Sequence, residues 1–153
     1  MSNDDCVEAW RALLQAENVV LRKIEADMQR AGVIALTWYD VLLELNAVPG
    51  RRLRMQDLAA RTVLSRTRVS RLVDELQAQD LVVREPDPAD GRVSFAVLTA
   101  TGRSALKVAA PIYLAGIKAH FTDHLTTTER SHITSALGKV IASHQQPLEP
   151  KRP

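Results

Sequence analysis

Arginine side chains gather in one short stretch of this 153-residue chain, and they determine the chemistry that the sequence offers. Between residues 51 and 71 there are seven arginines and one acidic residue, Asp57. The arginines are Arg51, Arg52, Arg54, Arg61, Arg66, Arg68 and Arg71. The net charge of the whole chain is only +2, so the excess is local. A local basic field of this kind attracts polyanions and is typical of nucleic-acid binding.

A helix that follows Ser65 and runs to Gln79 is predicted to position the second half of this cluster. Its apolar residues recur at three- and four-residue spacing, which predicts one buried face. They are Val69, Leu72, Val73 and Leu76. Ser65 is the expected N-cap. Arginine is unfavourable at the positive end of a helix dipole, so Arg66 and Arg68 favour an anionic partner; an ordinary solvated helix face is the alternative interpretation.

The elements around this helix predict a winged helix. A short helix over residues 55–62 and a turn at residues 63–65 precede it, which is a helix-turn-helix pattern. Residues 81–84 and 93–98 are predicted strands, and the turn cluster at residues 86–91 joins them into a β-hairpin. Such a hairpin can reach the DNA groove or backbone beside the preceding helix.

Two helices are expected before this unit. The first covers about residues 7–29 and ends near Gly32. Its heptad-like apolar spacing favours a dimer arm over a core helix of a monomer. The second is expected to start at Thr37 as its N-cap and to stop at residues 48–50, followed by a connector at residues 51–54.

Two further helices are expected after the hairpin. Thr99 caps the first, which runs to about Asp123 and is kinked at Pro111. The segment Thr126–Glu129 fits a capping box that opens the last helix. From Gln145 onward the chain is expected to be a frayed tail.

Composition and spacing exclude several other classes of protein. Cys6 is the only cysteine, so no intrachain disulfide is possible and a reducing, cytoplasmic location is expected. No apolar run is long enough to span a membrane. No phosphate loop, nucleophile elbow or Cys-x-x-Cys site appears, so the sequence predicts neither an enzyme nor a cofactor. His120 and His124 have metal-ligand spacing, but a solvated helix face is the favoured interpretation, so no metal is expected.

Residues 37–102 resemble the MarR family of bacterial transcriptional regulators. The resemblance rests on Leu36-Thr37 at the opening of the second helix, Asp57-Leu58-Ala59, Leu64-Ser65, the run from Val69 to Leu76, Leu81-Val82-Val83-Arg84, the Asp-x-Arg signature Asp90-Gly91-Arg92, and Leu98-Thr99-Ala100-Thr101-Gly102. Two positions depart from the family pattern. Asp80 stands where Gly is common after the recognition helix, and Arg54 stands where a Ser or Thr cap is usual.

The resemblance implies a mostly α fold with a small β-hairpin wing. Residues 1–34 would be an N-terminal dimerisation helix, 35–100 the winged helix-turn-helix DNA-binding domain, 101–146 the C-terminal dimerisation helices and 147–153 a flexible tail. It also implies a homodimer that binds double-stranded DNA at a palindromic operator, with one recognition helix of each subunit in a major groove and one wing at a minor groove.

The residues expected to contact DNA lie on the recognition helix and the wing. They are Ser65, Arg66, Thr67, Arg68, Ser70, Arg71, Asp90 and Arg92. Arginine pairs bidentately with guanine, and serine reaches bases or phosphates. By resemblance, Asp74 holds Arg92 in position and so orients the wing.

The resemblance further implies a repressor released by a small ligand, often phenolic or aromatic. Candidate ligand-binding residues are Trp10, Leu14, Trp38, Tyr39 and Asp40, with Arg71 as a further polar partner. Ordinary packing of these aromatics is the alternative interpretation. A thiol switch at Cys6, near the start of the first helix, is a second kind of signal. A winged-helix module for protein–protein interaction is an alternative function of another class.

Overall fold

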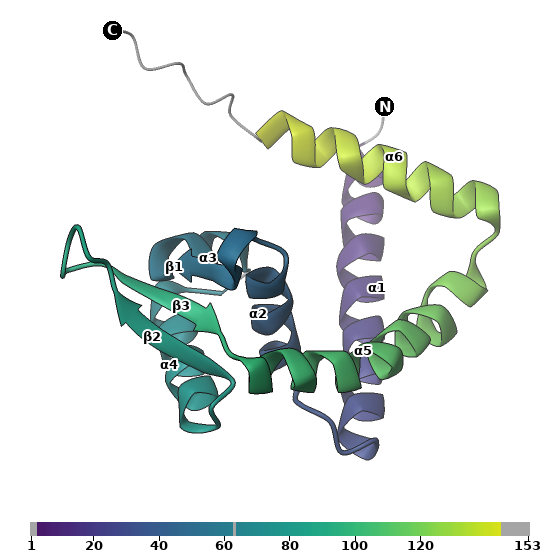
Figure 1. Cartoon of the computed structure of the whole chain (residues 1–153). Helices are drawn as coiled ribbons and strands as arrows, with labels where there is room; N and C mark the ends of the chain where they lie inside the picture. The colour runs from purple at the N-terminus through teal and green to yellow at the C-terminus, as the bar shows by residue number, and fades with distance from the viewer. Residues whose placement is uncertain (1–2, 63, 145–153) are drawn as a thin grey trace, which may run out of the picture.

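A computed structural model describes residues 3–62 and 64–144 (Figure 1). In chain order the elements are α1 (Asn3–Arg30), α2 (Leu36–Asn46), the 3-10 helix η1 (Pro49–Arg51), β1 (Arg52–Arg54), α3 (Met55–Arg61), α4 (Arg66–Ala78), β2 (Val82–Pro86), β3 (Ser94–Leu98), α5 (Ala100–His120), the 3-10 helix η2 (Thr122–His124) and α6 (Thr127–His144). The segment from α2 to β3 forms one unit, and α1, α5 and α6 extend beside it. The predicted tail from Gln145 onward, with residues 147–153, lies outside the described residues.

Helix α4 forms as its apolar spacing predicts. Its four apolar residues are all buried, and they belong to a core that also contains Leu42 of α2 and Leu58 of α3. The side chain of Ser65 accepts a hydrogen bond of 3.3 Å from the N–H of Arg68, which confirms the predicted N-cap. Burial of one face therefore fixes which residues of α4 face solvent.

Asp80 closes the far end of α4 without a glycine. Its φ of +56° is left-handed, a conformation that aspartate tolerates better than most residues. The N–H of Leu81 then donates to the carbonyl of Leu76 at 3.0 Å, so a terminal carbonyl of the helix is satisfied.

The sheet has three antiparallel strands in the order β1-β3-β2. The prediction of a connector at residues 51–54 is wrong, because residues 52–54 form the edge strand β1, in which Arg52 pairs with Val97 and Arg54 with Phe95. Gly50 and Arg51, with φ of +68° and +51°, turn the chain into this strand. A strand of three residues is too short to show an alternating pattern in the sequence. It forms because residues 52–54 pair with β3.

Helix α2 starts earlier than predicted. Its N-cap is Ala35, which makes no side-chain capping bond, so the prediction of Thr37 as the N-cap is wrong. The N–H of Tyr39 donates to the carbonyl of Ala35 at 2.9 Å. Leu36 is buried, and a helix that includes it places this side chain in the core.

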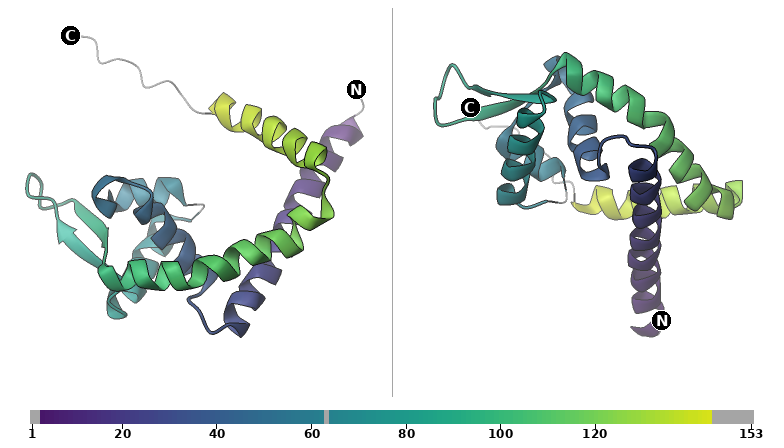
Figure 2. Two further views of the ribbon diagram at one scale, coloured as in Figure 1. Left: turned by 45° about the vertical axis from the view of Figure 1, so that its right-hand side comes forward. Right: turned by 90° about the horizontal axis from the view of Figure 1, so that it is seen from below.

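The C-terminal end of α1 packs on α5. Ile24 and Met28 are buried there, and Gly116 of α5 lets Ile24 approach closely. The Nε2 atom of His120 lies 2.6 Å from a carboxylate oxygen of Asp27, and this hydrogen bond lowers the pKa of Asp27. The N-terminal half of α1 projects away from the winged unit, and α5, which contains Pro111, curves along its length (Figure 2).

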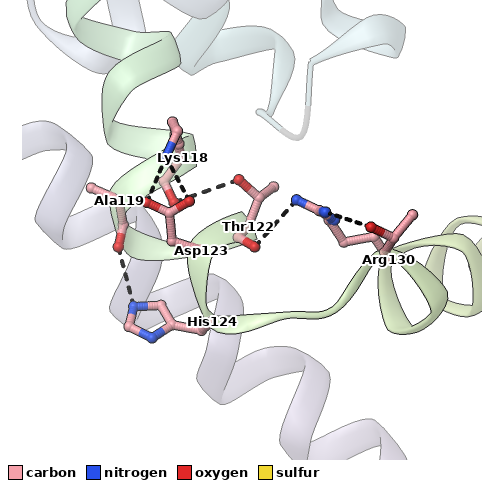
Figure 3. A network of polar contacts seen from close by, with 7 residues as sticks. Lys118, Ala119, Thr122, Asp123, His124 and Arg130 are labelled. Carbon is pink, nitrogen blue, oxygen red and sulfur yellow. Dashed lines mark hydrogen bonds and ion pairs between the residues drawn. The ribbon is translucent and has the colours of Figure 1, made fainter.

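A polar network forms the elbow between α5 and α6 (Figure 3). Helix α5 ends at His120 rather than near Asp123, and Lys118 pairs with the Asp123 carboxylate at 2.7 Å. His124 contacts the Ala119 carbonyl, so His120 and His124 have different partners, and no metal-binding cluster occurs within residues 3–62 and 64–144. Mutual bonds between Thr126 and Glu129 confirm the predicted capping box. No helix in the described ranges is long and apolar enough to cross a membrane.

Candidate nucleic-acid interface

The first two turns of α4 present unneutralised positive charge. Arg66, Thr67, Arg68 and Arg71 are all exposed. No ion pair joins these three arginines to an acid anywhere in the described part of the chain. One face of α4 is buried, and its opposite face is exposed and cationic. These arginines can therefore bind a polyanion without first breaking an ion pair to an acid of the protein.

Arg84 of β2 ties the wing to α4. Its Nη2 donates to the carbonyl and the hydroxyl of Ser70 at 2.9 and 3.0 Å, and lies 2.8 Å from the Asp74 carboxylate. The N–H of Arg84 also donates to the side chain of Gln77 at 3.1 Å. Ser70 is therefore a partner of Arg84, and its own O–H remains available to donate.

The sequence interpretation missed Arg84 as a functional residue. The alternating pattern of the strand indicates this role, because it places Val82 and Arg84 on the same face. Val82 is buried, so Arg84 also lies on the inner side of the strand. An arginine on the helix-facing side of a strand needs polar partners there. The Ser70 oxygens and Asp74 supply them.

The predicted pairing of Asp74 with Arg92 is wrong. Asp74 lies on the third turn of α4, beside the middle of β2, whereas Arg92 lies beyond the wing tip. Within the described residues Arg92 makes no ion pair, and its backbone N–H donates to the Asp90 side chain at 3.0 Å. Asp90 thus shapes the wing tip, and the exposed Arg92 side chain is free of any acid of the described chain.

A second ion pair attaches the wing to the end of β1. Asp87 is 9% exposed and accepts hydrogen bonds from the Arg54 guanidinium at 3.2 Å and from the Ala89 N–H at 2.9 Å. The neighbouring Arg52 stacks on the ring of Phe95 at 4.0 Å. The hairpin is therefore held on one side by Arg84 and on the other by Arg54.

A cleft of about 280 Å³ lies between α4, the start of α3 and the wing. Four arginines line it: Arg54, Arg66, Arg84 and Arg92. Asp87 and Asp74 pair with two of these arginines, so two positive charges remain unneutralised. The cleft between α4 and the wing is therefore positively charged.

Comparison with known proteins agrees with this geometry. The family model described as the MarR family matches residues 31–93. AbsC, a MarR family transcriptional regulator from Streptomyces coelicolor, has a solved structure that superposes on this chain with a TM-score of 0.80. The two sequences are 33% identical, and the alignment covers 94% of this chain and 95% of AbsC. The chain belongs to the MarR family.

Two other MarR-like structures extend the comparison. Sco3205 from Streptomyces coelicolor, solved in complex with DNA, is 27% identical over 100% of this chain and 95% of its own, with a TM-score of 0.81. BpsR from Bordetella bronchiseptica, whose DNA binding is regulated by 6-hydroxynicotinic acid, is 21% identical over 86% of this chain and 91% of its own, with a TM-score of 0.75. At that identity it shows the fold alone. A search of curated proteins gives no match. MarR proteins are DNA-binding regulators and not enzymes.

Breaking the Arg84 contact is expected to loosen the wing of this MarR protein. Asp74→Ala and Arg84→Gln should each lower DNA affinity without unfolding the domain, and their effects should not add fully, because both remove the ion pair between Asp74 and Arg84. We expect a coupling of about 0.5–1 kcal/mol for this partly exposed pair. DNA titrations of the two single variants and the double variant measure it. Fully additive losses would show that the pair does not position the wing.

The structure does not gather the five predicted ligand-binding residues into one cleft. Trp10 and Leu14 lie on the exposed half of α1, and the other three lie on α2. None of the five lines the cleft between α4 and the wing. Tyr39 is buried against Tyr113, with ring centroids 4.5 Å apart.

One of the three α2 residues, Trp38, nevertheless contacts α4, the recognition helix of the MarR fold. The indole N–H of Trp38 donates to the Glu75 carboxylate of α4 at 3.3 Å. Desolvation, and then repulsion by Glu44, raises the pKa of Asp40. Within the described chain, Trp38 thus links α2 to α4 by one hydrogen bond.

An apolar groove of about 590 Å³ separates the middle of α1 from α6. Leu13, Val20 and Leu21 of α1 line one side, and Phe121, Ile133 and Leu137 line the other. Large apolar side chains of the arms are also exposed: Val7, Trp10, Leu14, Val140 and Ile141. Contiguous apolar surface of this kind is typical of a protein interface.

Proposed function

We propose that this MarR protein is a homodimeric repressor that binds a palindromic operator through α4 and the wing. The observation that carries the proposal is the set of arginines on the first turns of α4, whose charges no acid of the described chain neutralises. Arg68 and Arg71 read bases in the major groove, and Arg66 and Arg92 contact the backbone. Thr67 and Ser70 add hydroxyl donors to the same surface.

The test is a binding titration on the DNA upstream of the protein's own gene, repeated from low to high salt. Phosphate contacts release counterions, so affinity should fall steeply and linearly in a double-logarithmic plot. Binding that is nearly independent of salt, or that survives without any arginine of α4, would favour a protein-interaction module instead.

The second chain of the proposed dimer covers the arms. A single chain leaves Trp10 61% and Ile141 59% exposed, together with the apolar groove between α1 and α6. Burial of apolar surface at about 25 cal/mol per Å² is the driving force for such an interface. Residues 1–34 and 101–146 are thus the dimerisation segments, and residues 35–100 the DNA-binding domain.

A charge on this surface is expected to break the dimer. Ile141→Glu should shift the protein from dimer to monomer at micromolar concentration, because a carboxylate would be buried without a partner. Sedimentation equilibrium measures the shift. Val83→Glu is the matched control, since Val83 is also exposed, at 39%, but lies on the wing. An unchanged mass for Ile141→Glu would contradict this interface.

We further propose that a small aromatic ligand releases the repressor from DNA. BpsR, with a similar fold, responds to 6-hydroxynicotinic acid. In this chain the hydrogen bond between Trp38 and Glu75 supports a route from α2 to α4. The ligand would favour the dimer conformation in which the two α4 helices no longer match the operator. Quenching of tryptophan fluorescence by 6-hydroxynicotinate, together with loss of DNA binding, tests the ligand class.

A further inference from the structure

Arg54 lines the cleft between α4 and the wing, although it is not among the residues that the sequence predicts to contact DNA. Arg54 ends β1 and occupies the N-cap position of α3, where it makes no capping bond. Its side chain is 46% exposed and lines the cleft together with Arg66 and Arg92. Arginines from β1, α4 and the wing loop therefore line one cleft.

Asp87 holds Arg54 in this position. The carboxylate is nearly buried, and one of its oxygens also accepts the Ala89 N–H, so it cannot follow Arg54 to another place without disrupting the turn. The pair is joined through a single guanidinium nitrogen, Nη2, at 3.2 Å. A guanidinium has five N–H donors, so others remain for a ligand in the cleft.

The position of the cleft selects its ligand, given the proposed function. A helix in the major groove has a phosphate backbone along each side, and a hairpin beside the helix must meet one of these backbones. The cleft lies between these two protein elements. Arg66 and Arg92, which no acid of the described chain neutralises, are opposite in charge to a phosphodiester and can donate hydrogen bonds to it.

We propose that one backbone phosphate of each operator half-site sits in this cleft, and that Arg54, positioned by Asp87, donates to it. Arg54 is then a direct DNA contact rather than only the counter-ion of a buried carboxylate. The phosphate is fixed by contacts from β1, α4 and the wing, so it sets the register of α4 along the groove.

A charge-balanced pair of variants separates the two roles of Arg54. Arg54→Gln removes the contact, and Arg54→Gln/Asp87→Asn removes it while also removing the carboxylate charge. Both should bind the operator about 100-fold more weakly, because the dimer loses two charge-assisted hydrogen bonds and each is worth about 10-fold. The salt slope should become shallower by about 0.9 per subunit in both.

Arg61→Gln/Glu44→Gln is the matched control. Arg61 is 48% exposed and pairs with Glu44 at 3.5 Å, but it does not line the cleft. This variant should keep the wild-type affinity and salt slope. Thermal unfolding of all the variants verifies that each is folded.

The result that overturns the proposal is recovery of wild-type affinity and slope in Arg54→Gln/Asp87→Asn, since Arg54 would then serve only to neutralise Asp87. A second measurement uses operators with one neutral methylphosphonate. The wild type should lose affinity at one phosphate per half-site, and Arg54→Gln should lose less there, because only Arg66 and Arg92 still contact that phosphate. Equal losses in both proteins would also overturn the proposal. Failure of the wild type to bind DNA at all would instead overturn the proposed function.

Discussion

Replacing both Arg68 and Arg71 by alanine is expected to abolish specific operator binding while leaving the fold intact. Both side chains are exposed and lack an acidic partner in the described chain, so their removal disturbs no internal contact. Each arginine that pairs with a guanine is worth about 1–3 kcal/mol, and the double variant removes both arginines from each chain of the dimer. The double variant should therefore lose at least about 100-fold in affinity. Fluorescence anisotropy with labelled operator measures the loss.

Two further variants define what the loss means. Arg103→Ala, on the first turn of α5, removes the same charge away from α4 and should bind within about twofold of the wild type. Arg71→Lys keeps the charge but not the planar pair of donors, so it should retain non-specific binding and lose sequence discrimination. Full activity of the alanine double variant would contradict the role assigned to α4.

Gly102→Ala is expected to give a large loss of stability. Gly102 is buried on the first turn of α5, where its N–H donates to the Thr99 hydroxyl at 2.9 Å. A Cβ atom there would overlap the Leu81 carbonyl oxygen and lie 2.7 Å from Leu98 Cδ1. The carbonyl belongs to the backbone at the base of the wing, so it cannot move away easily. Overpacking of this kind costs about 3 kcal/mol.

Urea unfolding measures this effect as a shift of the midpoint at constant slope. The matched control is Gly91→Ala at the wing tip, where a Cβ would meet nothing within 4 Å and where φ is not left-handed. This variant should be as stable as the wild type. An unchanged midpoint for Gly102→Ala would mean that α5 does not pack on the wing base as described.

The parts of the fold that could be predicted from sequence are those set by local chemistry. The apolar spacing in α4, the Ser65 cap and the Thr126–Glu129 capping box all depend on residues within one or two helical turns. Gly32, with a φ of +68°, ends α1 as expected for the same reason. Each signal lies within the segment that it shapes.

The parts that were missed depend on partners distant in sequence. Strand β1 exists because Leu53 pairs with Ala96 of β3, and nothing within residues 51–54 announces that pairing. The roles of Arg84 and Arg54 likewise follow from acids on other elements, Asp74 and Asp87. An arginine-rich sequence predicts a basic surface, but only the tertiary structure separates the neutralised arginines from the free ones.

Selection of DNA sites from a random duplex pool by the intact protein tests the central claim most directly. Two α4 helices related by a two-fold axis should enrich a palindrome whose half-site centres lie about one helical turn, about 34 Å, apart. Enrichment of a single half-site, of a non-palindromic sequence or of no sequence at all would contradict a dimer that reads DNA through α4.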